Sequence, residues 1–425
     1  IIQAATRPQG GSFGTPVDLS AAGQSAQNPQ IATARDGTAT AVWRRFDGAN
    51  SIIQAATRPP GGSFGAPVNL SAPGQNAAQP QVTTDPDGNF TVVWSGDGGL
   101  IQAATRPPGG SFGTPIDLSA IGGPAFNPQV AASPDGTVVV VWQRFDGTVD
   151  VIQASVRPPG GSFGAPVDLS APGEFTNLPH VAAAADGTAT AVWVGFDGVS
   201  TIVQAATRPP GGSFGPPVDL SAPGNFAREP RASAGPDGTV TVVWYRDDGA
   251  DDIVQAATRP PGGSFGVPVD LSATGQEAQE PGVSTAADGT TIVVWRRFDG
   301  SDTIVQAAKR PPGGSFGIPV NLSATGQGAF GPRISTSPDG ATTAVWVRSN
   351  GANFIVQSVS TAPVSRLLQI NRQGSGSGTV VSGPVGIDCG TDCAELYPLS
   401  TVVALNANPD PGSTFTGWTG AGCSG

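Results

Sequence analysis

Short apolar runs separated by turn residues recur along most of the chain. Residues 38–44 and 52–57 are examples, rich in Val, Ile, Thr and Trp, and Gly- or Pro-containing turns bound them on both sides. Runs of this length and composition, bounded in this way, are typical of β-strands. The pattern predicts an all-β protein.

The same phrase of strands and turns repeats through the chain. A glutamine marks each copy, and successive copies lie 51 residues apart, with one interval of 48. In the first complete copy, four strands are predicted at residues 29–34 (strand A), 38–44 (B), 52–57 (C) and 66–71 (D). A period near 50 residues with four short strands is typical of a β-propeller blade. The marker glutamines are Gln3, Gln54, Gln102, Gln153, Gln204, Gln255, Gln306 and Gln357.

The number of elements predicts seven four-stranded blades. The B strand carries seven tryptophans, whereas the C strand occurs eight times, so residues 1–7 or 355–361 are surplus. We expect the N-terminal D strand, residues 16–20, to complete the blade begun by residues 332–361, because closing the ring hides the sheet edges. The tryptophans are Trp43, Trp94, Trp142, Trp193, Trp244, Trp295 and Trp346.

Residues that recur in every copy have structural explanations. A tryptophan that ends a buried strand is expected to pack between neighbouring blades. The arginine after strand C and the Asp or Asn of strand D, such as Arg157 and Asp168, are expected to pair and to brace the C–D hairpin. The Asp-Gly pairs are expected to form hairpin turns.

Composition and charge exclude some classes of function. The chain has 21 basic and 32 acidic residues, a net charge of −11 and one lysine, Lys309, so it lacks the basic surface that nucleic-acid binding requires. No run of 18 apolar residues is present, so no membrane span is predicted. The chain contains no methionine and begins inside a repeat, and we expect it to be a piece of a longer product.

The most variable positions predict where a ligand binds. In a propeller the B–C loops and D–A connections share one face, called here the variable face, and in this chain they carry nearly all the differences between blades. Polar residues gather there where strand A begins. His180 is the only histidine, which excludes a zinc site with several imidazole ligands. The candidate ligand-binding residues are His180, Arg228, Glu229, Arg231, Glu280 and Arg333.

One B–C loop is strongly acidic. Asp247, Asp248, Asp251 and Asp252 place four carboxylates within six residues. Carboxylate oxygens are ligands for calcium, so this loop is a candidate calcium site. A solvated acidic loop that binds nothing is the alternative. No other cofactor is predicted.

Two family resemblances follow from the motifs. The Arg-Pro-Pro-Gly-Gly-Ser-Phe-Gly turn, the Asp-Gly turns and the Val-Trp strand resemble bacterial extracellular propellers grouped with sialidase-type repeat proteins, over about residues 1–361. After a linker at 362–367, residues 368–425 resemble the small all-β internalin B-repeat of bacterial surfaces. The second resemblance implies a disulfide between Cys389 and Cys393 and a further cysteine after Gly425, so we expect this module to be truncated. Both imply a secreted protein of a bacterial cell surface.

Near-identical blades favour many weak, equivalent sites that act together. We therefore expect a non-catalytic, lectin-like binding or adhesion module, with carbohydrate the first ligand and protein the second, acting as a monomer or within a larger surface protein. One alternative is a sialidase-like, glycoside-active enzyme in the mouth of the variable face, with Glu229 and Glu280 as acid and base. Against it, Tyr245 is the only propeller tyrosine and is predicted in a B–C loop. A structural spacer or assembly subunit is the other alternative.

Overall fold

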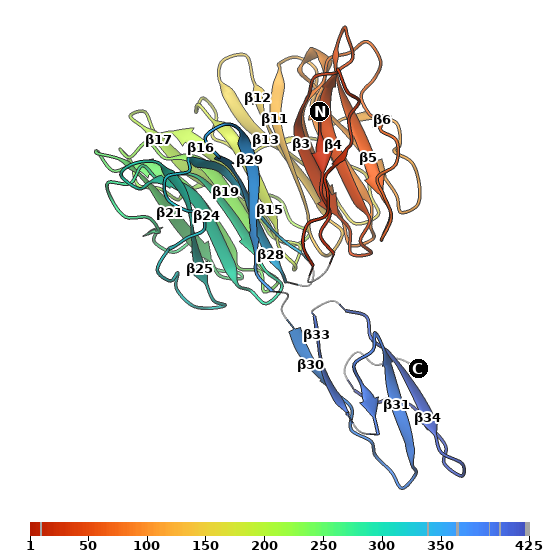
Figure 1. Cartoon of the computed structure of the whole chain (residues 1–425). Coiled ribbons are helices and arrows are strands. Elements are labelled where there is room, and N and C mark those ends of the chain that lie inside the picture. Colours follow the sequence, from red (N-terminus) through yellow and green to blue (C-terminus); the bar gives the residue numbers. More distant parts are fainter. Residues whose placement is uncertain (9–10, 338–339, 363–364, 391, 399–400, 421–425) are drawn as a thin grey trace.

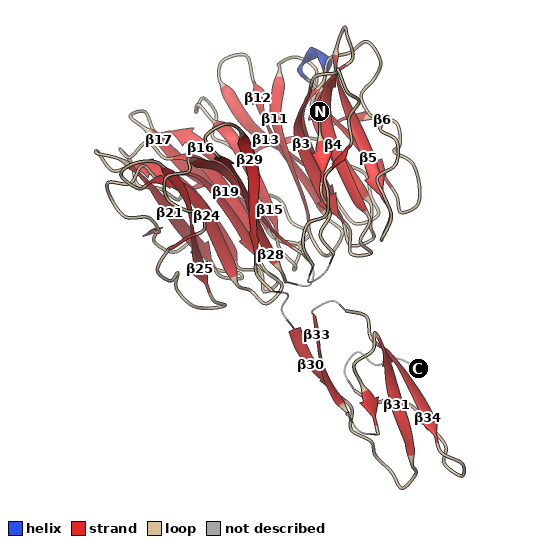
Figure 2. Ribbon diagram, viewed as in Figure 1, coloured by secondary structure: helices blue, strands red, loops and turns tan. Residues whose placement is uncertain are grey.

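The protein is all-β, as predicted. The computed structural model describes residues 1–8, 11–337, 340–362, 365–390, 392–398 and 401–420. Figure 2 shows strands throughout, with one short 3-10 turn, η1 (Asp97–Gly99), in the described chain.

Six four-stranded antiparallel sheets follow one another along the chain, each with its strands in sequence order. Figure 1 shows them side by side around a common axis, the arrangement of a β-propeller. In order from strand A to strand D they are β3 (Ala26–Thr33), β4 (Ala39–Phe46), β5 (Ser51–Arg58) and β6 (Val68–Asn69); β7 (Ala78–Thr84), β8 (Phe90–Ser95), β9 (Ile101–Arg106) and β10 (Ile116–Asp117); β11 (Ala125–Ala132), β12 (Val138–Phe145), β13 (Asp150–Arg157) and β14 (Val167–Asp168); β15 (Asn177–Ala183), β16 (Ala189–Phe196), β17 (Thr201–Arg208) and β18 (Val218–Asp219); β19 (Arg228–Ala234), β20 (Val240–Asp247), β21 (Asp252–Arg259) and β22 (Val269–Asp270); β23 (Gln279–Thr285), β24 (Thr291–Phe298), β25 (Thr303–Arg310) and β26 (Val320–Asn321).

The ends of the repeat form two smaller sheets. Strands β27 (Ala329–Thr336), β28 (Thr342–Ser349) and β29 (Phe354–Ser360) make a three-stranded sheet, and β1 (Gln3–Ala4) pairs with β2 (Val17–Asp18). The predicted closure therefore does not form, because β2 pairs with β1 and not with β29. The physical reason is locality: β1 and β2 are joined by one short turn, so their pairing needs far less loop-closure entropy than pairing with the far end of the repeat.

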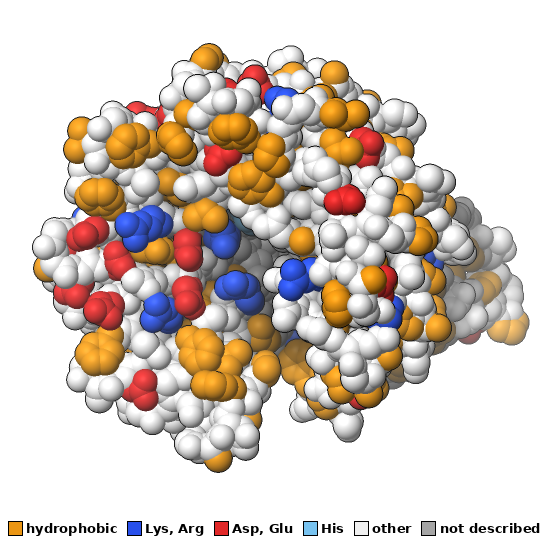
Figure 3. Space-filling view, turned by 90° about the horizontal axis from the view of Figure 1, so that it is seen from above, with side chains coloured by type: hydrophobic (Ala, Val, Ile, Leu, Met, Phe, Trp, Pro, Cys, Tyr) orange, Lys and Arg blue, Asp and Glu red, His pale blue; other side chains and the backbone are white. Residues whose placement is uncertain are grey.

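A seam separates the first and last sheets. Each innermost A strand lies against the next, from β3 and β7 to β23 and β27, but β27 and β3 make no comparable contact in the described part of the chain. Across the seam, the Arg7 guanidinium donates a hydrogen bond to the Thr343 hydroxyl at 3.3 Å. Figure 3 shows a slot that runs from the central hollow to the edge of the molecule.

Burial between sheets explains the apolar runs. Strand β12 reads Val-Val-Val-Val-Trp, and each of these side chains is fully buried, because neighbouring sheets cover both faces of a blade. The repeated tryptophans confirm their predicted role: six are fully buried and Trp346 is 4% exposed. The packing of one sheet on the next thus forms the core of the ring.

The brace of each C–D hairpin differs from the prediction. Asp168 accepts a hydrogen bond from the Gln153 side chain at 2.8 Å, and not from Arg157. Gln153 lies directly opposite Asp168 in the ladder, so its amide is in reach without bending. Arg157 instead lies over the Phe163 ring at 5.5 Å and forms an ion pair with Asp85 of a neighbouring blade at 3.2 Å.

The C-terminal residues form two further small sheets. Strand β30 (Ser365–Gln369) pairs with β33 (Ala394–Pro398), and β31 (Gly378–Gly383) pairs with β32 (Asp388–Cys389) and β34 (Ala404–Pro409). Cys389 and Cys393 form a disulfide, whereas Cys423 lies outside the described residues. Their apolar cluster includes Val380 and Tyr397. In the described chain, no helix has the length and apolar character needed to cross a membrane.

We predict that Trp193→Ala destabilises the propeller by about 3–5 kcal/mol, because it leaves a large cavity between two sheets. The Trp193 indole also donates to the Gln204 side chain at 2.8 Å, and this partner would be lost. Urea-induced unfolding measures the change. Val199→Ala is the control, since Val199 is 76% exposed, and it should leave the unfolding midpoint unchanged. An unaltered midpoint for Trp193→Ala would contradict the packing described here.

Candidate functional site

Every A strand is bulged near the variable face. In β19, for example, the pairing register shifts between Arg228 and Arg231. The residue before the proline of each bulge has a left-handed backbone, which is costly for residues other than glycine. Bulges redirect side chains, so these seven positions determine which groups each A strand presents at the mouth of the ring. They are Asn28 (φ 54°), Gln79 (φ 56°), Asn127 (φ 53°), Leu178 (φ 50°), Glu229 (φ 50°), Glu280 (φ 56°) and Gly331 (φ 62°).

Some bulge residues fasten one blade to the next. The Gln79 side-chain oxygen accepts a hydrogen bond from the Asn127 amide at 2.9 Å. In the same way, Glu280 Oε2 accepts from the Gly331 amide at 2.8 Å, and its other oxygen forms an ion pair with Arg296 Nε at 3.2 Å. Both oxygens of Glu280, a predicted acid or base, are therefore occupied by structural partners.

His180 is held neutral in the throat, which we define as the inner edge of the ring at the variable face. Its Nδ1 accepts a hydrogen bond from the Ala232 amide at 3.2 Å. Burial, and then the charge of Arg231, lower the pKa of His180 to about 3. Because Nδ1 accepts, the proton of the neutral ring is on Nε2. At neutral pH, His180 is thus a hydrogen-bond donor.

Two arginines, Arg231 and Arg333, also belong to the throat, and the charge of Arg231 acts on His180. Arg231 and Arg333 each donate to the carbonyl of the preceding proline, at 3.0 and 2.9 Å. Burial lowers the pKa of Arg231, Glu229 raises it and Arg333 lowers it, so the two guanidiniums repel each other. Among the described residues, neither has a carboxylate within ion-pair distance. Figure 3 shows basic and acidic side chains around the central hollow of this face.

The third group of the throat is Glu229, with Arg228 and Tyr245. Glu229 is half-buried and accepts no hydrogen bond in the described chain. Tyr245 lies in strand β20, where the sequence had predicted a loop, and packs in the core between two blades. Burial raises the pKa of Tyr245, as does Glu229, while a hydrogen bond with Arg228 lowers it. A buried, protonated phenol is not a nucleophile, so no nucleophilic role is assigned to Tyr245.

Most carboxylates of the acidic loop accept hydrogen bonds within the protein, and the calcium site stays a prediction. Asp248 accepts backbone hydrogen bonds from Ala250 and Asp251, both at 2.9 Å, and Asp247 accepts from Gly249 at 2.7 Å. Asp252 accepts from the Gln279 side chain. Asp247 and Asp248 thus accept from backbone amides of their own turn, and Asp252 accepts from the next A strand. Nowhere in the described ranges do three or more acidic, histidine or cysteine residues gather to hold a metal.

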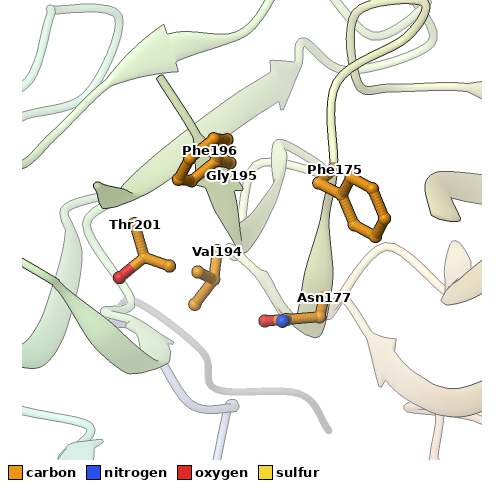
Figure 4. Close-up of a pocket in the computed structure, with 6 residues that line it drawn as sticks. All are labelled: Phe175, Asn177, Val194, Gly195, Phe196 and Thr201. Atoms are coloured by element: carbon orange, nitrogen blue, oxygen red, sulfur yellow. The ribbon is translucent and has the colours of Figure 1, made fainter. Parts of the chain in front are cut away.

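Sequence reasoning missed a pocket of about 300 Å³ on the same face. Figure 4 shows its lining residues around a common space. It lies at the end of β16, where Val194 and Gly195 follow the tryptophan; at these positions β4 and β24 have two arginines. That departure from the repeat is the signal in the sequence. The lining residues are Phe175, Asn177, Val194, Gly195, Phe196 and Thr201.

Comparisons with solved structures identify the fold. An ulvan lyase of a polysaccharide lyase family has a TM-score of 0.51 at 10% identity, covering 79% of this chain and 93% of the lyase. A leech intramolecular trans-sialidase scores 0.45 at 9% identity, covering 81% and 70%. An α-L-arabinanase from Penicillium chrysogenum scores 0.41 at 12% identity, covering 64% and 92%. No protein-family model and no curated protein matches the sequence.

These neighbours correct the expected function. The ulvan lyase, whose fold this chain shares, is an enzyme that cleaves a polysaccharide. The expectation of a non-catalytic binding module is therefore wrong, and a carbohydrate-active enzyme replaces it as the hypothesis. At this level of identity, the likeness establishes the β-propeller fold.

We predict that His180 makes the protein sensitive to mild acid. An unfolded histidine titrates near pH 6.5 and the folded one near 3, so between these values the unfolded state binds more protons. Stability from the neutral ring is complete above about pH 6.5 and is lost as the pH falls toward 3. Between about pH 7.5 and 4.5, wild type should lose about 2–3 kcal/mol more than His180→Gln in urea unfolding.

The comparison with His180→Gln cancels the carboxylates that titrate in the same range, because both proteins contain them. Equal losses of stability in the two proteins would show that His180 is not held neutral.

Proposed function

We propose that the protein is a carbohydrate-active enzyme that cleaves an anionic polysaccharide in the mouth of its variable face. The observation that carries the proposal is the pair of guanidiniums, Arg231 and Arg333, that repel each other and have no carboxylate within ion-pair distance in the described chain, although the charge of Glu229 attracts Arg231. An anionic substrate group between them would relieve that repulsion. Arginine is suited to this task because its planar fork matches a carboxylate or a sulfate.

The available side chains favour β-elimination over hydrolysis. Hydrolysis uses two carboxyl groups, but both oxygens of Glu280 are engaged, which leaves Glu229. In elimination, Glu229 takes the proton from the carbon next to the carboxylate of a uronic acid residue. The electron pair forms a carbon–carbon double bond as the glycosidic oxygen leaves and is protonated from water.

The remaining groups stabilise the charge that develops in this step. As the proton leaves, negative charge grows on the substrate carboxylate, and the guanidiniums of half-buried Arg231 and exposed Arg333 stabilise it. The Nε2–H of His180 adds a neutral donor beside them. The ulvan lyase acts on a polysaccharide, and its shared fold is consistent with this assignment.

The proposal extends to features of the whole protein. We count the β27–β29 sheet as the seventh blade, and we place the propeller at residues 1–361 and a surface-repeat module at 368–425, joined by a linker at 362–367. The kinship with sialidase-type repeats and with the internalin B-repeat belongs to the same proposal. The Cys389–Cys393 disulfide supports a secreted protein at a bacterial surface, since disulfides persist in oxidising compartments.

We predict that the protein releases unsaturated ends from ulvan or polygalacturonate, but not from neutral arabinan. Ultraviolet absorbance detects the double bond, and a reducing-end assay counts all cleavage. Glu229→Gln should lower kcat/KM about 10²–10⁴-fold, and Arg231→Ala about 10²–10³-fold. Arg35→Ala, an exposed arginine in an A–B turn, is the matched control and should retain full activity.

Two results would decide against the proposal. Reducing ends without unsaturation would replace elimination with hydrolysis. Full activity of Glu229→Gln would show that the throat takes no part in the reaction.

A further inference from the structure

One blade lacks a bridge that other blades have. In β4 the residue after the tryptophan, Arg44, donates to the side chain of Gln27 on the adjacent strand. Arg296 donates to Gln279 in the same way. In β16 this residue is Val194, which is too short to cross to its partner Asn177. Asn177 is exposed, and within the described chain its side chain forms no hydrogen bond.

The residue after Val194 enlarges the space that this short side chain leaves open. It is Gly195 in β16 but arginine in β4, β12, β20, β24 and β28. A Cβ atom on Gly195 would lie 2.6 Å from the side-chain oxygens of both Glu174 and Gln204, so a larger residue here would have to displace these two side chains. Two short residues thus open the pocket of about 300 Å³.

The pocket is lined by two exposed aromatic rings and by two polar side chains, Asn177 and Thr201. Phe175 is 60% exposed and Phe196 is 43% exposed, although burying such rings is favourable. The Thr201 hydroxyl is buried without a hydrogen-bond partner. Figure 4 shows both rings, Asn177 and Thr201 around the same space. Apolar rings with a few polar groups are how proteins recognise ligands that have an apolar face and a polar edge.

A single sugar residue has this chemistry and this size. Its C–H face can cover an aromatic ring while its hydroxyls reach an amide and a hydroxyl. The volume is at the lower end of the roughly 300–1,000 Å³ of ligand pockets, so one residue fits and a longer segment does not. No arginine or lysine lines the pocket, and the Glu174 carboxyl lies against its Gly195 floor. A neutral sugar is therefore favoured over an anionic one.

We propose that this pocket binds a neutral sugar residue of the polysaccharide substrate. The identity of that polymer rests on the proposed function. The position supports it, because strand β15 carries Asn177 in the pocket and His180 in the throat, on either side of the bulge at Leu178. A chain whose anionic residue lies between Arg231 and Arg333 would extend outward over this blade.

The test measures binding separately from cleavage. Methyl glycosides of rhamnose, xylose, arabinose, galactose and glucose are titrated into the protein and followed by saturation-transfer difference NMR. Wild type should bind at least one of them. Val194→Arg introduces the residue that β4 and β24 have at this position and should weaken binding at least tenfold, as should the double variant Phe175→Ala/Phe196→Ala.

The controls separate this inference from the proposed function. Phe46→Ala removes an exposed phenylalanine from a blade that keeps its two arginines, and it should bind as wild type does. Glu229→Gln should also keep binding, because the pocket does not use that carboxylate, whether or not the protein proves to be an enzyme. The proposal is overturned if no glycoside binds to wild type, or if Val194→Arg, with an unchanged melting temperature, binds as wild type does. Should Val194→Arg not fold, unchanged binding by the double phenylalanine variant would overturn it equally.

Discussion

The short D strand depends on side-chain clamps to strand C. Only two residues of each D strand join the ladder. In all seven C–D pairs of the described chain, a C-strand glutamine donates to the D-strand Asp or Asn at 2.7–3.0 Å. A D-strand serine also accepts from a C-strand amide at 2.7–3.0 Å. Each interface between blades is sealed by a leucine and a phenylalanine that lie next to clamped D strands. Leu220 directly follows β18 and Phe265 precedes β22, and both pack in one cluster, so the core depends on the clamps.

The open seam is explained by the short distance along the chain between β1 and β2. Residues 1–20 contain a complete set of clamps, so they pair as a hairpin and pack on Trp43 of the next blade. Strand β29 is then left without a D strand. Beside it lies an apolar space of about 360 Å³ lined by Ile318 and Val359, whereas Phe316 packs into the preceding interface. Phe13, the remaining phenylalanine of this series, is exposed. Two equivalent C strands compete for one closing position, and the nearer one is paired.

The sequence predicted what depends on hydrophobic period and turn chemistry, and it failed where several polar partners compete. Strand positions and tryptophan burial follow from apolar runs between turns. The Arg157–Asp168 pair was wrong because spacing alone does not say which donor lies opposite the carboxylate; the ladder places Gln153 there. The left-handed backbone of Leu178 and Glu229 opposes their local preference and is imposed by the bulge. The binding role of the throat residues stays a prediction. The engagement of Glu280 and the strand position of Tyr245 depend on which groups lie opposite each other in space, and spacing along the sequence does not give this.

The repeat supplies the same backbone frame in every blade, and this favours one asymmetric site over many equal ones. The bulges hold the backbone of the mouth in one conformation in every blade, so substituting a side chain there changes chemistry with little change in structure. Where the bulge residue is Gln79 or Glu280, it fastens neighbouring blades. Where the repeat departs from its pattern, at His180 and Arg231, the frame gains a neutral donor and a guanidinium with no carboxylate within ion-pair distance in the described chain. A near-constant frame with a few local departures is therefore sufficient to build a single site, and the near-identity of the blades is no argument against catalysis.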